Sequence, residues 1–163
     1  MSLDDLPPPL STEDLLAEIR RVFHGVALGT GRGLWEAQAF DDYADKDDQG
    51  AARKQDEKLD WSAIVPSTLA RCHDSLCFFD ADGMRFHLPA FLVAEIDGAL
   101  DMSPIFSLTH CSDYTKSQFA SLNDNQRRCV IHFLKWCLPQ DRYCGDRREI
   151  EEALRDYWND LLI

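Results

Sequence analysis

Apolar side chains recur at intervals of three and four residues along most of this 163-residue chain. This spacing places them on one side of an α-helix and predicts helices rather than strands. Ser11 can cap the first helix, because the acid Asp14 follows three residues later, as in a capping box. Helices are predicted within residues 11–24, 34–44, 61–65, 66–72, 89–97, 122–138 and 146–158.

Residues 76–88 break this pattern, with two short aromatic-rich runs on either side of Asp-Ala-Asp-Gly. Such a sequence favours a β-hairpin, in which Gly83 supplies the positive φ angle that a tight turn needs. Alternation along the second strand then places Arg85 and His87 on one face and apolar side chains on the other. The predicted fold class is α+β, mostly α, with five to seven helices around one β-hairpin and a single core.

The length and composition are those of one domain. Residues 1–10 contain three consecutive prolines and are predicted to be a flexible lead-in, with a single globular domain over residues 11–163. The first residues lack the basic and apolar regions of a secretory signal, and no apolar stretch approaches the ~18 residues of a membrane span. We therefore expect a cytoplasmic protein without a membrane segment, whose six cysteines are free thiols.

The formal net charge of −12 argues against two classes of partner. Phosphate backbones and anionic membrane surfaces repel such a chain, so we expect it to bind neither nucleic acid nor membrane. Residues 41–60 are the most polar stretch, with 8 acids and 4 bases. An acidic surface attracts basic proteins, which makes a basic protein the expected partner. The simpler alternative is that the charge serves solubility.

No residue pattern assigns catalytic chemistry, a metal or a cofactor. Histidines and cysteines could ligate zinc, but neither Cys-x-x-Cys nor His-Glu-x-x-His occurs. The segment from Asp45 to Asp56 only partly matches a calcium loop, because Asp56 stands where Glu is usual. The glycine-rich residues 29–33 follow a helix and lack a closing Lys-Ser or Lys-Thr, so we expect a connector rather than a phosphate-binding loop. We predict no catalytic residue, no metal site and no cofactor.

Four sequence elements occur in order along the chain: Asp41-Asp42-Tyr43, Trp61-x-x-Ile64 with Leu69, the segment 78–90, and Phe119-x-x-Leu122-x-x-x-Gln126 leading into Phe133-Leu134. The most specific element reads Phe-Phe-Asp-x-x-Gly-x-Arg-Phe-x-Leu-Pro-Ala. Together they resemble, over roughly residues 11–140, an uncharacterised bacterial domain family of short soluble proteins of unknown function. The resemblance implies a bacterial cytoplasmic protein, and it transfers no activity, cofactor or catalytic residue.

The favoured function is a non-enzymatic, cytoplasmic protein-interaction module, an immunity-type or regulatory binder with an acidic surface. This function is favoured because the chain is acidic and contains no recognisable catalytic motif. The polar segment 41–60 is the first place to expect that surface. The candidate ligand or partner surface comprises Asp41, Asp42, Tyr43, Trp61, Arg85 and His87.

Two other functions remain open. The first is a small-ligand-binding protein or hydrolase with an unrecognised site near the predicted hairpin, formed by Arg85, His87, His110 and Asp113, with Trp61 and Tyr43 as walls. The second is a subunit of a homodimer or larger assembly, because four Trp and nine Phe could exceed what one core needs. The sequence leaves the oligomeric state open.

Overall fold

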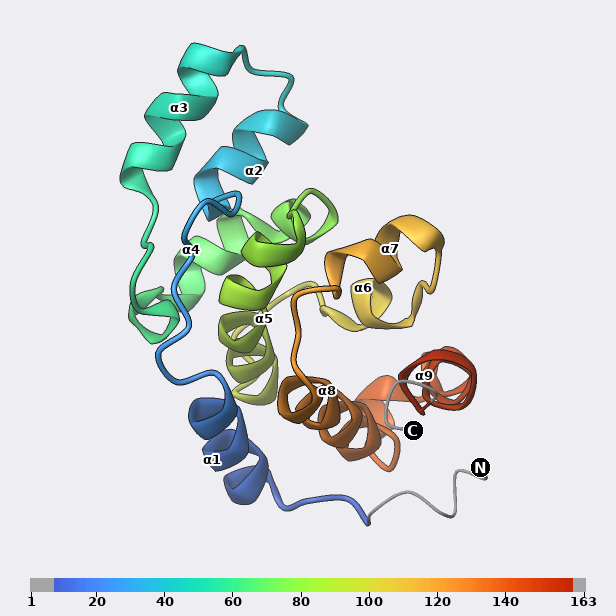
Figure 1. Cartoon of the computed structure of the whole chain (residues 1–163). Coiled ribbons are helices and arrows are strands. Elements are labelled where there is room, and N and C mark those ends of the chain that lie inside the picture. The colour runs from blue at the N-terminus through green and yellow to red at the C-terminus, as the bar shows by residue number, and fades with distance from the viewer. Residues whose placement is uncertain (1–7, 160–163) are drawn as a thin grey trace.

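The computed structural model describes residues 8–159, and these residues are mainly helical and contain no β-strand (Figure 1). Their nine α-helices are α1 (Thr12–Val22), α2 (Leu34–Asp41), α3 (Lys46–Gln55), α4 (Pro66–Arg71), α5 (Ala81–Ile96), α6 (Ile105–Thr109), α7 (Asp113–Gln118), α8 (Asp124–Cys137) and α9 (Arg147–Ala153). Short 3-10 helices span Trp61–Ala63, His73–Cys77 and Asp141–Tyr143, and a π-helical turn spans Leu154–Trp158.

The predicted β-hairpin at residues 76–88 is wrong, and with it the α+β fold class and the count of five to seven helices. These residues form the end of a 3-10 helix and the first half of α5. Asp80 is the N-cap of α5, and its carboxylate accepts a hydrogen bond from Gly83 N at 2.8 Å. Asp-Ala-Asp-Gly therefore starts a helix. The predicted shared face of Arg85 and His87 is also wrong, because residues two apart diverge by about 200° around a helix.

The burial of α5 explains why its sequence does not show a helical pattern. All of its residues from Gly83 to Ile96 are buried except Arg85 and Val93. Apolar residues therefore surround the helix instead of forming one stripe, and the run lacks a 3.6-residue period. Such a run is hard to distinguish from a buried strand. Pro89, predicted to end a strand, lies inside this helix.

Helix α5 lies at the centre of the fold, where it contacts α1, α4 and α7 (Figure 1). Helix α1 packs against α8, and α6 packs against α9. Helices α2 and α3 contact each other and form a helical hairpin at one end of the molecule (Figure 1). The buried apolar side chains form one cluster, whose largest members include Phe23, Phe86, Phe133 and Trp158.

The predicted starts of two helices, α1 and α8, are confirmed. Ser11 caps α1, because its Oγ accepts a hydrogen bond from Asp14 N at 3.1 Å. Asn123 caps α8, where its Oδ1 accepts from Gln126 N at 2.9 Å and Gln126 Oε1 accepts from Asn123 N at 3.0 Å. These contacts are local, so the sequence alone is sufficient to predict them.

The remaining predictions on organisation are tested only in part. Within residues 8–159, no helix has both the length and the apolar character that a membrane crossing requires. The predicted lead-in lies mostly outside the described residues, which begin at residue 8. The single domain over residues 11–163 and the cytoplasmic location stay predictions.

Candidate functional site

The turn between α2 and α3 brings together acidic residues that the sequence assigned to a partner surface. Asp42 is the C-cap of α2, and Asp45 is the N-cap of α3, where its carboxylate accepts from Asp48 N at 2.8 Å. Carboxylates at a helix start interact favourably with the helix dipole, which favours Asp45, Asp47 and Asp48 at the start of α3. We call this turn the acidic tip and define it as Asp41, Asp42, Tyr43, Asp45, Asp47 and Asp48.

The acidic tip is exposed and mostly unneutralised. Its carboxylates are all exposed except that of the half-buried Asp41, and none forms an ion pair within the described residues. Between residues 41 and 48, Lys46 is the only base against five acids, which gives a local net charge of −4. Figure 1 places this turn at the far end of the α2–α3 hairpin, away from the other helices.

Tyr43 lies in the middle of the acidic tip, and it is 96% exposed. Its φ angle of 59° lies in the left-handed region, which few non-glycine residues adopt. No other non-glycine residue in the described part of the chain has a positive φ. The turn therefore presents an aromatic ring to water among carboxylates, at a position where Gly or Asn is usual.

Helix α3 contributes no buried side chain. Arg53 fixes it to the rest of the chain, because its guanidinium donates to the carbonyl oxygens of Gly29 and Gly31 and pairs with Glu36 at 2.9 Å. The glycine connector is tightly packed, since a Cβ on Gly31 would lie 2.7 Å from Gly83 N. The outer surface of α3 is therefore free of any role in the core.

Asp56 fixes the start of α2, the other helix of this hairpin. Its carboxylate accepts hydrogen bonds from Trp35 N at 2.7 Å and from Glu36 N at 3.2 Å. Burial raises the pKa of the Asp56 carboxyl, although these two hydrogen bonds oppose that change. The side chain fills the space beside Gly33, where a Cβ would overlap its Oδ2. The hairpin is thus positioned by buried contacts at its base, while its tip stays in solvent.

A small aromatic patch continues from the acidic tip along α2. Phe40 is 42% exposed, its ring centroid lies 5.7 Å from that of Phe78, and the Arg32 guanidinium lies 4.4 Å from its ring centroid. Tyr114 of α7 is 57% exposed and donates its hydroxyl to the Cys77 carbonyl oxygen at 2.8 Å. Aromatic and arginine side chains of this kind are enriched in protein interfaces.

Two of the predicted surface residues, Trp61 and His87, lie in the core. Trp61 is 6% exposed and donates its indole N–H to Phe23 O at 3.0 Å. His87 is fully buried, stacks on Phe79 at a centroid distance of 4.4 Å, and contacts Gly83 O through Nδ1 at 2.7 Å. Burial lowers the pKa of His87 to about 4, so the ring is neutral at pH 7. Neither side chain is available to a partner.

The other polar residues expected near the hairpin belong to different helices or helix ends. Arg85 is half-buried, and its Nε donates to Gln126 Oε1 at 3.3 Å, which connects α5 to the start of α8. His110 follows α6 and stacks on the exposed ring of Phe106 at 5.0 Å. Asp113 begins α7. The predicted hairpin that was to bring these residues together does not form, so it supports no site.

The three buried cysteines give no reactive thiolate in their present environment. All six are free, and Cys72, Cys129 and Cys137 are buried. Burial raises the pKa of the Cys72 thiol to about 12, and it raises the pKa values of the Cys129 and Cys137 thiols as well. Buried thiols of this kind are weak nucleophiles, because the thiolate is the reactive form. Within residues 8–159, no group of three or more His, Cys, Asp or Glu side chains is arranged to hold a metal ion.

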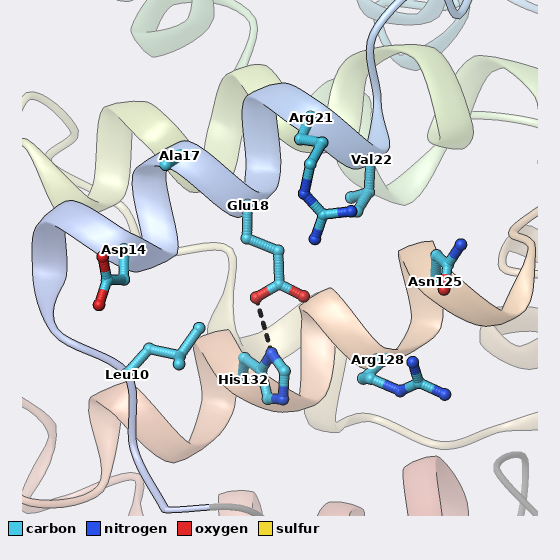
Figure 2. Close-up of a pocket in the computed structure, with 9 residues that line it drawn as sticks. All are labelled: Leu10, Asp14, Ala17, Glu18, Arg21, Val22, Asn125, Arg128 and His132. Atoms are coloured by element: carbon cyan, nitrogen blue, oxygen red, sulfur yellow. Dashed lines mark hydrogen bonds and ion pairs between the residues drawn. The ribbon is translucent and has the colours of Figure 1, made fainter.

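A groove that the sequence does not predict adds a second candidate site. It lies between α1 and α8 and has a volume of about 510 Å³ (Figure 2). Glu18 of α1 and His132 of α8 meet across it, with Glu18 Oε2 2.7 Å from His132 Nδ1. Arg21 and Arg128 line the same groove. It therefore combines cationic groups with a carboxylate–imidazole pair, in a chain that is acidic overall.

The sequence contains one indication of this groove, which is a polar stripe on each of the two helices that form it. One stripe on α1 and one on α8 have helical spacing, and they are formed by Asp14, Glu18 and Arg21 and by Asn125, Arg128 and His132. Each stripe alone is typical of a solvated helix face. Only the packing of α1 against α8 makes the two stripes face each other.

Residues 8–159 thus define a small helical protein with an exposed acidic hairpin at one end and a mixed-charge groove between two other helices. The chain belongs to the DUF6714 family, a family of unknown function whose model matches residues 11–162. This match confirms the resemblance to an uncharacterised domain family and extends it beyond residue 140. No curated protein and no solved structure matches the chain. Family membership therefore assigns no activity.

Proposed function

We propose that this protein is a cytoplasmic, non-enzymatic interaction module that binds a basic segment of a partner protein through the acidic tip. The observation that carries the proposal is Tyr43, an aromatic side chain 96% exposed among five carboxylates on a hairpin whose second helix contributes nothing to the core. Folding does not require an apolar ring at this position. Binding to a partner protein gives a physical reason for an exposed aromatic ring at this position.

Charge would supply the long-range attraction to such a partner. The local net charge of −4 at the tip is part of a total of −12, and a field of this sign accelerates encounter with basic proteins. The same field opposes nucleic acid. A basic protein segment is therefore the partner chemistry that the tip fits.

Tyr43 would supply short-range affinity. Tyrosine is enriched among binding hot spots, because its ring offers a large contact area with few rotatable bonds. Its face also attracts lysine and arginine side chains. A partner that reaches past the tip would further contact Phe40 and Tyr114, which are 42% and 57% exposed. By covering a basic surface of its partner, this protein would block or regulate that partner without any catalytic group. This is the action of a regulatory or immunity-type binder.

Site-specific crosslinking provides the first test. A photoreactive phenylalanine replaces Tyr43 in one full-length variant and Phe106 in a matched variant, since Phe106 is 64% exposed on α6. We expect a basic protein to crosslink at position 43 and not at position 106. Equal crosslinking at both positions, or none at position 43, contradicts the proposal.

Charge reversal provides the second test, on the affinity for the captured partner. The variant carries Asp42→Lys and Asp47→Lys, and the control carries Glu13→Lys and Glu151→Lys, two exposed acids outside the tip. Both variants change the net charge equally. We expect the tip variant to bind at least about tenfold more weakly, with a shallower salt dependence, and the control to bind much as the unmodified chain. If the control loses as much affinity, overall charge and not the tip drives binding.

A further inference from the structure

The Glu18–His132 pair in the α1–α8 groove leaves one imidazole nitrogen available. The two side chains are each 11% exposed, and the two residues are 114 apart in sequence. A carboxylate only accepts hydrogen bonds, so Nδ1 carries the proton that it donates to Glu18. Figure 2 shows the second ring nitrogen, Nε2, on the side of the ring away from Glu18. The described residues provide no further hydrogen-bond partner for this imidazole.

Two arginines of the same groove are also unpartnered. Arg21 and Arg128 are exposed, and neither side chain has a hydrogen bond or ion pair within the described residues. Other arginines in this chain are paired, as Arg53 is with Glu36 and Arg142 is with Glu95. Each free guanidinium offers a planar set of donors that matches a carboxylate or a phosphate group.

The two ends of the groove differ in charge. Asp14 and Arg21 are seven residues apart on α1, which is about 10 Å along the helix. Figure 2 shows Asp14 at one end of the groove and Asn125 and Arg128 at the other. Leu10, Ala17 and Val22 provide apolar surface within it. An anionic group is therefore favoured at the Arg21 and Arg128 end and disfavoured near Asp14.

We infer that this groove binds a small organic anion with a phosphate or carboxylate head group. Arg21 and Arg128 bind the head group, and His132 Nε2 donates a further hydrogen bond to it when both ring nitrogens carry a proton. The ligand body lies over Leu10 and Ala17 and is uncharged or carries an amine toward Asp14. In that doubly protonated form, His132 offsets the charge of the Glu18 carboxylate, so Glu18 repels the head group less than a free carboxylate would. The groove volume of about 510 Å³ lies in the range of pockets that bind small organic molecules.

The groove is a different surface from the acidic tip, so this inference does not depend on a protein partner. The test titrates the full-length protein with phenyl phosphate, with benzoate and with the neutral benzyl alcohol, and follows backbone amide and histidine signals by NMR. We expect saturable shifts in α1, in α8 and at the His132 ring with an oxyanion probe, and none with benzyl alcohol. The tighter of the two oxyanions identifies the head group. The absence of saturation by either at millimolar concentration overturns the inference.

Matched variants locate the site. Arg21→Gln and Arg128→Gln each remove one proposed contact, whereas Arg20→Gln removes the same charge from the neighbouring residue of α1, which lines other surfaces near Trp61. We expect roughly tenfold weaker binding of the preferred probe for each of the first two and little change for Arg20→Gln. All three arginines are exposed, so the variants should unfold at the same urea concentration as the unmodified chain. Equal losses for all three variants would show non-specific charge binding and overturn the inference.

Discussion

Asp56 caps a helix that begins 22 residues before it, with its Oδ1 2.7 Å from the backbone nitrogen of Trp35. The residue that precedes α2 is Gly33, which has no side chain to act as a cap. The first turn of α2 therefore depends on a carboxylate supplied from the segment after α3. This contact connects the base of the acidic hairpin to the rest of the fold.

Replacement of this cap should destabilise the protein. We expect Asp56→Ala to lower the free energy of unfolding by about 1–2 kcal/mol, because the amides of Trp35 and Glu36 lose their acceptor. Asp56→Asn keeps one acceptor oxygen and should lose less. Urea unfolding measures both, with the exposed Asp47→Ala as the control. Equal stability of Asp56→Ala and the control would contradict this role of Asp56.

Alanine should have opposite effects at two helical glycines. A Cβ at Gly83 in α5 would lie 2.5 Å from Arg32 O, whereas a Cβ at Gly50 in α3 meets nothing within 4 Å. We expect Gly50→Ala to stabilise by about 0.5–1 kcal/mol through helix propensity. Gly83→Ala should instead destabilise by about 1–3 kcal/mol, because the backbone of α5 and the glycine connector must separate. Thermal and urea unfolding of the two variants decides the sign at each position.

His87 should make the protein less stable in mild acid. Its pKa is about 4 in the folded chain and near 6.5 when exposed, so the unfolded state takes up a proton first as the pH falls. Its contribution to stability is complete above pH 6.5 and is lost between pH 6.5 and 4, by about 3 kcal/mol in total. The measurement compares the change in unfolding free energy over this range for the unmodified chain and His87→Leu. Other titrating groups cancel in that comparison, and equal slopes would show that His87 is not the cause.

A buried carboxylate at the end of α5 should also matter for stability. Glu95 Oε1 accepts hydrogen bonds from Tyr143 Oη at 2.6 Å and from Arg142 Nη2 at 2.8 Å, and its side chain is 6% exposed. We expect Glu95→Ala to destabilise by about 2–3 kcal/mol, since both donors lose their acceptor. Glu95→Gln, which keeps one oxygen, should lose about half as much. Guanidinium unfolding measures the free energy of unfolding of these variants, with Glu151→Ala as an exposed control. If Glu95→Ala destabilises no more than the control, Glu95 does not have this stabilising role.

The error over residues 76–88 has a specific physical origin. The same four residues, Asp-Ala-Asp-Gly, can turn a hairpin or cap a helix, because Asp80 can accept a backbone hydrogen bond in either geometry. What selects the helix is the burial of α5 on all sides and the hydrogen bond that Asp80 also accepts from Arg32 N at 2.9 Å. Arg32 is 48 residues away in sequence, so no local pattern contains this contact.

Of the six residues proposed for the candidate surface, the three that lie together at the acidic tip are neighbours in the sequence. Asp41, Asp42 and Tyr43 are consecutive, and their place between two helices keeps them together at the exposed tip. His87 was assigned to the same surface through the alternation of the predicted strand and Trp61 as a possible wall of the site, and the structure buries both. Whether the exposed part binds a partner stays a prediction.

The sequence by itself determined the helix starts at Ser11 and Asn123 and the acidic balance. Each of these depends on charge or on contacts within about four residues of chain. Tertiary structure alone decided that α5 is a central helix, that Asp56 caps α2, and that Glu18 meets His132 across the groove. Those outcomes depend on which helices bury one another, and burial is a property of the whole packed chain that no local spacing encodes.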